Sequence, residues 1–199
     1  MALKHSYTLL APIYDKLVGG ALDSTRQSSL KRLKDTQNKS ILINGIGSGL
    51  DIPYLPEANY TGSDITPVVL TIANNRSIKY KMPISLICAD SQSLPFKNES
   101  FDIIVMHLIL AVVPDPVSAL NEACRVLKPG GKIYLLDKFI RPGQIAIVRR
   151  LINILLRHIA TRTDVVFERT LQQCQELKCL SDKPALAGGW FRLLELEKR

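Results

Sequence analysis

The feature that most constrains this fold is the alternation of β-prone apolar runs with stretches of helical pattern along residues 41–139. Two parallel strands need a long crossover between them, which is usually a helix, so the alternation predicts a parallel sheet covered by helices on both faces. We therefore expect an α/β fold with a doubly wound sheet. The expected helices lie at 8–37, 50–56, 67–78 and 115–131, and the expected strands at 41–45, 60–64, 84–90, 101–110 and 132–139.

The composition bounds the class of protein. The 199 residues suffice for one domain with a sizeable core, and 46% of them are hydrophobic, as in a globular protein. No stretch reaches the ~18 uncharged apolar residues of a spanning helix, and the charged N-terminus does not fit a signal peptide. Four cysteines do not make a disulfide framework here, and Cys174 and Cys179 have no neighbouring His or Cys to complete a metal site. The composition predicts a cytoplasmic, reduced protein without a metal.

A glycine-rich turn follows the first expected strand in the stretch ILINGIGSG, where Gly45, Gly47 and Gly49 alternate with other residues. Ligands of doubly wound sheets sit at the carboxyl ends of the strands, where bare backbone lets a ligand approach unpaired amides. The dinucleotide fingerprint would need a glycine where Leu50 stands, and the G-K-[ST] of a phosphate-binding loop is absent. The turn is therefore expected to hold something other than a pyrophosphate.

Acidic residues end the next two expected strands. Asp64 can accept from both hydroxyls of a ribose, and Asp90 can accept from an adenine amino group while Ser91 helps to fix the base. Each acid alone could equally serve a turn or a helix N-cap. Three ligand-type positions on three successive strand ends point instead to one ligand. A ribose and an adenine without a phosphate cradle describe S-adenosylmethionine.

The ordered motifs ILINGIGSG, YTGSDITP, CADSQSLPF, FDIIVMHLIL and ALNEACRVLKPGGKIYLLD resemble those of class I S-adenosylmethionine-dependent methyltransferases over about residues 40–140. The resemblance implies a Rossmann-like, seven-stranded sheet with an antiparallel last strand, a final β-hairpin in 177–184 and 189–199, and S-adenosylhomocysteine as a product. Asn44 departs from the family, which usually has an acid there. The cofactor-binding residues that the resemblance implies are Tyr14, Asn44, Gly45, Ile46, Gly47, Ser48, Asp64, Ile65, Asp90, Ser91 and His107.

The two ends carry a narrower resemblance. YTLLAPIYDKLVGGALDSTRQSSLKRL and LILAVVPDP are similar to stretches of bacterial phosphatidylethanolamine N-methyltransferases that associate with membranes, and quinone-biosynthesis methyltransferases share the A-x-x-YD opening. The resemblance implies a single domain with a helical lid at 1–39, a cofactor-binding core at 40–140, and a cap helix and hairpin at 141–199. Tyr7 and Tyr14 would then line the pocket under the lid, although Tyr14 is equally explained as a packed aromatic residue.

The charge is unevenly distributed, because residues 1–40 carry a net +4, residues 41–137 a net −2 and residues 138–199 a net +6. An anionic partner for the flanks would explain this: a membrane surface, a phosphorylated substrate or nucleic acid. Within 144–162 an apolar stripe of helical spacing stands beside several arginines, which fits a helix lying on an anionic bilayer. A lid helix over the active site, with its arginines in water, fits equally well.

Three functions compete. The first is methylation of a small molecule or lipid headgroup, with N-methylation of phosphatidylethanolamine as the sharpest version and a quinone precursor as the alternative. In that case His107 and Tyr7 are expected beside the acceptor as catalytic residues, and His107 could hold a proton. A single histidine at a strand end is explained at least as well by a contact with the cofactor or by packing. Methylation of nucleic acid is less expected, because the segment MHLILAVVPDP has neither an N/D-P-P-Y loop nor a cysteine nucleophile. A non-catalytic cofactor-binding module is prompted by Asn44 alone.

Overall fold

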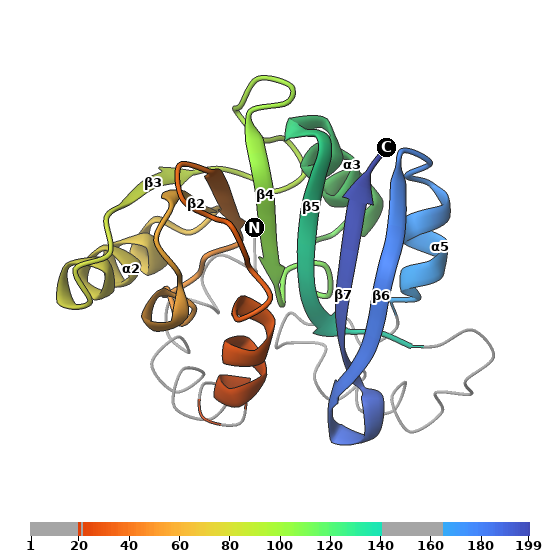
Figure 1. The fold of residues 1–199 in the computed structure, drawn as a ribbon, viewed down its shortest axis with the longest axis horizontal. Helices are drawn as coiled ribbons and strands as arrows, with labels where there is room; N and C mark the ends of the chain where they lie inside the picture. The colour runs from red at the N-terminus through yellow and green to blue at the C-terminus, as the bar shows by residue number, and fades with distance from the viewer. Residues whose placement is uncertain (1–19, 21, 141–164) are drawn as a thin grey trace.

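The computed structural model describes residues 20, 22–140 and 165–199, which form a seven-stranded sheet with helices on both faces (Figure 1). The strand order is β3-β2-β1-β4-β5-β7-β6. The strands are β1 (Ser40–Asn44), β2 (Asn59–Asp64), β3 (Ile84–Cys88), β4 (Phe101–His107), β5 (Leu127–Lys138), β6 (Leu177–Leu186) and β7 (Phe191–Lys198). The helices are α2 (Pro67–Lys79), α3 (Pro116–Val126) and α5 (Phe167–Gln172), with short 3-10 turns η1 (Ile52–Tyr54) and η2 (Ala187–Gly189).

The strand directions confirm the expected topology. Strands β1 to β5 pair in parallel, and β7 runs antiparallel to both β5 and β6. The chain winds outward from β1 to β3, then returns to place β4 on the other side of β1. The switch in strand order therefore lies between β1 and β4, and the carboxyl ends of β1 to β4 open there, as a binding site in such a sheet requires.

The central strands are buried on both faces, which is why they are almost continuously apolar. Along β4, Ile104 and Met106 pack into one core cluster with α3 and α5, while Ile103 and Val105 pack into a second cluster on the opposite face. The second face is covered by the N-terminal helical segment, residues 22–30, which lies on the opposite side of the sheet from α3 and α5 (Figure 1). Successive side chains of a strand point to opposite faces of the sheet, so each central strand contributes residues to two separate hydrophobic clusters.

Two expected helices are shorter than the sequence pattern indicated. The stretch 50–56 forms only the single turn η1, because Leu55 precedes a proline and takes an extended conformation (φ −71°, ψ 130°). The helix expected over 115–131 ends at Val126, and β5 already includes Gly130 and Gly131. Pro129 explains the early end, because a proline ring clashes with the carbonyl one turn earlier in a helix.

The strands lie where they were expected, with ends that differ by a few residues, and the C-terminal hairpin of β6 and β7 is confirmed. The helix expected over 8–37 also ends early, at residue 30, and α5 was not among the expected helices. Tyr7, Tyr14 and the basic segment 144–162 lie outside the described residues. None of the helices described here is long and apolar enough to span a bilayer.

Candidate functional site

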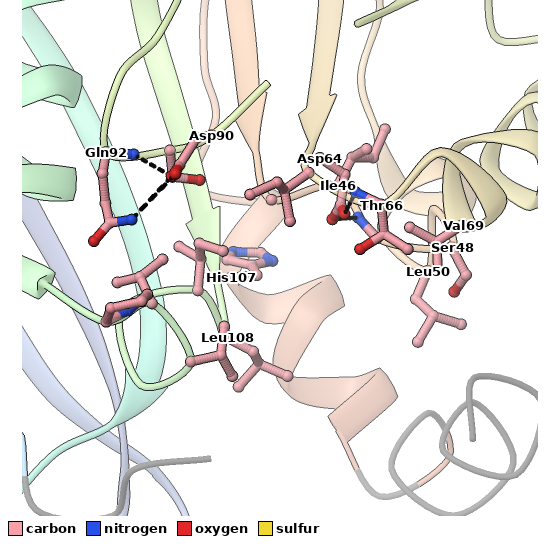
Figure 2. A pocket seen from close by; sticks show the side chains of 18 of the residues that line it. Ile46, Ser48, Leu50, Asp64, Thr66, Val69, Asp90, Gln92, His107 and Leu108 are labelled. Carbon is pink, nitrogen blue, oxygen red and sulfur yellow. Dashed lines mark hydrogen bonds between the residues drawn. The ribbon is translucent and has the colours of Figure 1, made fainter. Parts of the chain in front are cut away.

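A pocket of about 270 Å³ opens at the carboxyl ends of β1, β2, β3 and β4, beside the switch in strand order. Each strand contributes the residues that follow it, so the wall is assembled from segments far apart in the sequence. Figure 2 shows Asp64 with Thr66 on one side of the pocket and Asp90 with Gln92 on the other. The lining residues predicted from the sequence are Gly45, Ile46, Gly47, Ser48, Asp64, Ile65, Asp90, Ser91 and His107.

The turn after β1 is made possible by its glycines. Gly45 has φ +78° and Gly47 has φ +54°, a region that side-chain-bearing residues rarely adopt. A Cβ on Gly45 would lie 2.8 Å from the side chain of Ile109, so this glycine allows the loop after β4 to approach the turn. A Cβ on Gly47, in contrast, would meet no protein atom within 4 Å. Gly47 lines the pocket, so its bare backbone leaves space that a ligand can fill.

Asp64 holds the turn and faces the pocket. Its Oδ2 accepts a hydrogen bond from the Gly47 amide at 3.0 Å, and its Oδ1 accepts one from the Thr66 amide at 2.9 Å. Burial raises the pKa of Asp64, and the backbone donors at Thr66 and Gly47 oppose this effect. The carboxylate thus keeps acceptor capacity in a place where little water competes, which suits it to ligand hydroxyl groups.

Asp90 is braced by Gln92, a residue that the sequence analysis did not single out. The amide of Gln92 donates to Asp90 Oδ1 at 2.9 Å, and its side-chain Nε2 donates to both carboxylate oxygens at 3.1 and 3.2 Å (Figure 2). The Oε1 of Gln92 accepts from the Asp115 amide at 2.8 Å, and Asp115 is the N-cap of α3. Gln92 therefore ties the carboxylate at the end of β3 to the start of a helix.

Asn44 and Ser91 form a buried pair at the base of the site. The Asn44 side chain is fully buried, and its Oδ1 accepts hydrogen bonds from Ser91 at 2.7 Å and Ser63 at 3.3 Å. Ser91 was expected to help fix a base, and its hydroxyl is used here to join the end of β3 to the end of β1. Asn44 itself is not among the residues that line the pocket, so it acts on the pocket through Ser91.

His107, at the end of β4, belongs to a buried hydrogen-bonded network. Its Nδ1 lies 2.9 Å from Oδ1 of Asp51, and its Nε2 lies 2.9 Å from the hydroxyl of Ser29 on the N-terminal helical segment. The carboxylate can only accept, so Nδ1 carries a proton, while the hydroxyl of Ser29 can either donate to Nε2 or accept from it. Arg26 donates to the same Asp51 oxygen at 2.9 Å. The network joins the N-terminal helical segment to the floor of the pocket.

Asp51 is the anion at the centre of this network. Burial alone would raise the pKa of Asp51, but the charges and hydrogen bonds of His107 and Arg26 outweigh it and hold the pKa well below its usual range. Sequence analysis missed Asp51, Ser29 and Arg26. Asp51 directly follows the glycine turn, which was the one signal available for it.

The remaining wall is apolar and comes from the segment after β4, residues 108–114. Leu108 has φ +60°, and its amide donates to the carbonyl of Leu136 at 2.7 Å, so the chain leaves the sheet in a sharp, strained turn. The buried carboxylate of Asp137, at the end of β5, accepts from the Ala111 amide at 3.0 Å. Burial raises the pKa of Asp137 to about 6. This carboxylate therefore positions the apolar wall.

Metal chemistry has no visible basis in residues 22–140 and 165–199. These residues contain no group of three or more His, Cys, Asp or Glu side chains that could hold a metal ion. The four cysteines are free: Cys124 and Cys174 are buried, whereas Cys88 and Cys179 are exposed. The site thus offers carboxylates, bare backbone and an apolar wall to an organic ligand.

Residues 42–135 match a family described as a methyltransferase domain. The chain is 27% identical to a phosphatidylethanolamine N-methyltransferase of Cereibacter sphaeroides over 202 residues, which cover 100% of this chain and 98% of the relative. It is 33% identical to a ubiquinone biosynthesis O-methyltransferase of Hydrogenovibrio crunogenus over 117 residues, which cover 57% of this chain and 48% of that relative. The chain therefore spans about half the length of the second relative.

Two solved structures share the fold. The [4+2]-cyclase SpnF superposes with a TM-score of 0.80 at 17% identity, covering 98% of this chain and 94% of the other. A geranyl diphosphate C-methyltransferase of Streptomyces coelicolor, solved with S-adenosylhomocysteine, superposes with a TM-score of 0.73 at 13% identity, covering 88% of this chain and 76% of the other. The open space beside Gly47 and the carboxylates of Asp64 and Asp90 fit such a nucleoside ligand. The chain therefore carries a methyltransferase domain and is an S-adenosylmethionine-dependent methyltransferase, with S-adenosylmethionine as its cofactor.

Proposed function

We propose that this enzyme methylates the amino group of phosphatidylethanolamine at a membrane surface. The observation that carries the proposal is the extent of the similarity to the Cereibacter sphaeroides enzyme, which includes both flanks as well as the cofactor-binding core. The resemblance implies that the flanks cover the acceptor side as a lid and a cap, so similarity there bears on the acceptor. The ubiquinone biosynthesis relative matches a much smaller share of the chain.

The pocket suggests how the cofactor is held. The turn containing Gly45, Ile46, Gly47 and Ser48 would face the methionyl end, Asp64 and Ile65 would bind the ribose, and Asp90 with Ser91 would fix the adenine. Asn44 would support the site from below through its hydrogen bond with Ser91. The cofactor supplies an electrophilic methyl group when bound. The protein has to align the acceptor with that group and exclude water.

His107 is proposed to act on the acceptor. It lines the pocket, and with Nδ1 bonded to Asp51 its Nε2 is the basic atom. An amine must lose a proton to be methylated, and Nε2 can hold that proton while the carboxylate of Asp51 stabilises the resulting imidazolium. The hydroxyl of Ser29 then has to turn away from Nε2. Tyr7, outside the described residues, is proposed as a second group beside the acceptor.

Contact with the membrane is proposed through the basic residues of the C-terminal flank, where residues 138–199 carry a net +6. Within this flank, 144–162 combines arginines with apolar residues at helical spacing. Such a segment would bind more strongly to bilayers that contain anionic lipid. A peripheral enzyme of this kind would reach a headgroup without spanning the bilayer.

The proposal is tested with methyl-labelled S-adenosylmethionine and vesicles of phosphatidylethanolamine, with and without phosphatidylglycerol. We expect label in methylated phosphatidylethanolamine, and more of it when the anionic lipid is present. Asp64→Ala serves as the control, since it should lose cofactor binding and therefore all transfer. No label in lipid from an enzyme that still binds S-adenosylhomocysteine would reject phosphatidylethanolamine as the acceptor.

A quinone precursor is the second candidate, favoured by the higher local identity of the ubiquinone biosynthesis relative. Vesicles of phosphatidylcholine that carry reduced demethylubiquinol or demethylmenaquinol distinguish the two acceptors. Label in the quinol fraction with none in phosphatidylethanolamine would establish the second candidate. Label in phosphatidylethanolamine alone would exclude it.

A further inference from the structure

Arg26 is an unusual member of the pocket wall. It lies on the N-terminal helical segment, on the face that also buries Leu22, Ser29 and Leu30, and its side chain lines the pocket. Arginine is almost never buried without a partner, because removing its charge from water is costly. Arg26 nevertheless exposes only 6% of its surface. A buried guanidinium at the wall of a ligand pocket needs a reason.

Its partners inside the protein do not satisfy it. Nη1 donates to Oδ1 of Asp51 at 2.9 Å, and Nε is buried with no hydrogen-bond partner. Asp51 is also shared, because the same oxygen accepts from His107 Nδ1. Two parallel N–H···O bonds are the strongest arrangement that a guanidinium and a carboxylate can make, and Arg26 contacts Asp51 through one nitrogen only. Asp51 therefore holds Arg26 in place without using its full donor capacity.

The pocket holds carboxylate acceptors and one cationic donor. Asp64 ends β2 and Asp90 follows β3, on opposite sides of the pocket (Figure 2), whereas Arg26 is the one Lys or Arg side chain among the described lining residues. Arg26 is bonded to Asp51, which follows the glycine turn after β1 and also contacts His107. The site therefore offers acceptors for hydroxyl and amino groups and, near the glycine turn, a cationic donor. A ligand that matches this pattern carries hydroxyl or amino groups together with an oxyanion.

We propose that Arg26 binds an oxyanion of the ligand through guanidinium N–H groups that Asp51 does not engage, with Asp51 as the positioning residue. The methionyl carboxylate of the cofactor has this chemistry, and so does the phosphate of a phospholipid acceptor. The carboxylate is the source favoured by the position of Arg26 beside the glycine turn. The inference rests on the cofactor arrangement proposed above and does not depend on which acceptor is methylated.

The experiment compares two ligands that differ in the oxyanion. S-Adenosylhomocysteine carries the carboxylate, whereas 5′-methylthioadenosine keeps the adenine and ribose but lacks the amino-acid end. Calorimetric titration of Arg26→Gln should show about 10- to 100-fold weaker binding of S-adenosylhomocysteine, as expected for a hydrogen bond to a charged group. Binding of 5′-methylthioadenosine should stay within about twofold of the wild type. Arg26→Lys, which keeps the charge, should lose less.

Arg32→Gln is the matched control. Arg32 also ties the N-terminal region to the sheet through one carboxylate, since Nη2 lies 2.7 Å from Glu195 Oε2, but it does not line the pocket. This variant should bind both ligands as the wild type does. Equal weakening of both ligands by Arg26→Gln would reveal a distorted pocket and overturn the proposal.

The phosphate source is examined by titrating phosphoethanolamine into enzyme saturated with S-adenosylhomocysteine. If Arg26→Gln leaves the binding of S-adenosylhomocysteine unchanged and abolishes that of phosphoethanolamine, the oxyanion is the phosphate. Two outcomes would show that Arg26 does not bind an oxyanion. In the first, Arg26→Gln binds both ligands as tightly as the wild type does. In the second, the wild type does not bind phosphoethanolamine and Arg26→Gln binds S-adenosylhomocysteine normally.

Discussion

At the scale of single residues, the site depends on one deeply buried anion. Asp51 exposes only 3% of its surface and accepts hydrogen bonds from Arg26 and His107 through one oxygen. Removing one side chain from a set of buried, paired charges usually lowers stability by more than the whole set contributes to it. The reason is that the remaining charges lose their partner in a medium of low dielectric constant. Asp51 is thus a structural requirement as well as a part of the site.

We predict that Asp51→Asn lowers the free energy of unfolding by about 3 to 5 kcal/mol at neutral pH, measured by urea denaturation. The pKa of Asp51 is depressed in the folded state, so its contribution is complete above the unfolded pKa of 3.8 and is lost as the pH falls further. The difference between variant and wild type should therefore narrow below about pH 4. A difference that is already small at pH 7 would contradict the role given to Asp51.

The residues that could be predicted from the sequence are those with a local signature. Gly45, Gly47, Asp64 and Asp90 each stand at the end of an apolar run, and all four line the pocket. Arg26 and Gln92 line it as well, but their roles depend on contacts with partners 25 and 23 residues away. No periodicity or motif encodes such a pairing, since it arises only when the helical segment or α3 packs onto the sheet.

At the scale of elements, the pocket wall is fixed by side chains that reach across from neighbouring elements. Gln92 links the carboxylate after β3 to the N-cap of α3, and Asp137 near the end of β5 holds the segment after β4. The strands were predictable because their apolar runs are long. The early ends of η1 and α3 were not, because a proline overrode the helical pattern locally.

Removal of the Gln92 bridge should affect binding more than folding. We predict that Gln92→Ala weakens S-adenosylhomocysteine binding several-fold, because Asp90 loses the side-chain donor that orients its carboxylate, while the free energy of unfolding falls by about 1 kcal/mol. Ser118→Ala is the control, since Ser118 donates to the same N-cap, Asp115, at 2.6 Å but lies outside the pocket. Calorimetry should find unchanged affinity in the control. Equal losses in both variants would mean that α3 is required only as a whole.

The wall held by Asp137 should respond to pH. The pKa of Asp137 is raised from 3.8 to about 6, so its stabilising contribution is complete below pH 3.8 and is lost as the pH rises through 6. Asp137→Asn cannot ionise and keeps an oxygen for the Ala111 amide. Relative to the wild type, the variant should gain up to about 3 kcal/mol of unfolding free energy between pH 4 and pH 7.5, measured by urea denaturation. A difference independent of pH would show that Asp137 does not titrate in this range.

At the scale of the whole molecule, a buried arginine secures the C-terminal hairpin to the sheet. Arg192 on β7 exposes 2% of its surface, forms ion pairs with Asp182 on β6 and Glu168 on α5, and lies over the rings of Phe139 and Phe167. Phe139 precedes segment 141–164 in the chain, and the other partners follow it. The cluster thus joins the hairpin, α5 and the end of β5 into one unit.

We predict that Arg192→Ala lowers the free energy of unfolding by about 3 to 5 kcal/mol, because it removes the guanidinium from two partly buried carboxylates and opens space between two rings. Its affinity for S-adenosylhomocysteine should be unchanged where the variant is folded, since Arg192 does not line the pocket. Lys132→Met breaks a more exposed pair with Glu195 and should cost less than about 1 kcal/mol. A similar cost for both variants would argue against the cluster around Arg192.

The position of β7 also determines the order in which the strands can pair while the chain is synthesised on the ribosome. β7 follows β6 in the chain, yet it lies between β5 and β6 and pairs with both of them. The half of the sheet that carries the pocket can assemble as soon as β5 has been synthesised, whereas β6 must wait for β7 to emerge. During that interval β5 presents an unpaired edge, which is the kind of surface on which nascent chains associate. Yield in cells should therefore depend on how quickly residues 191–198 leave the exit tunnel.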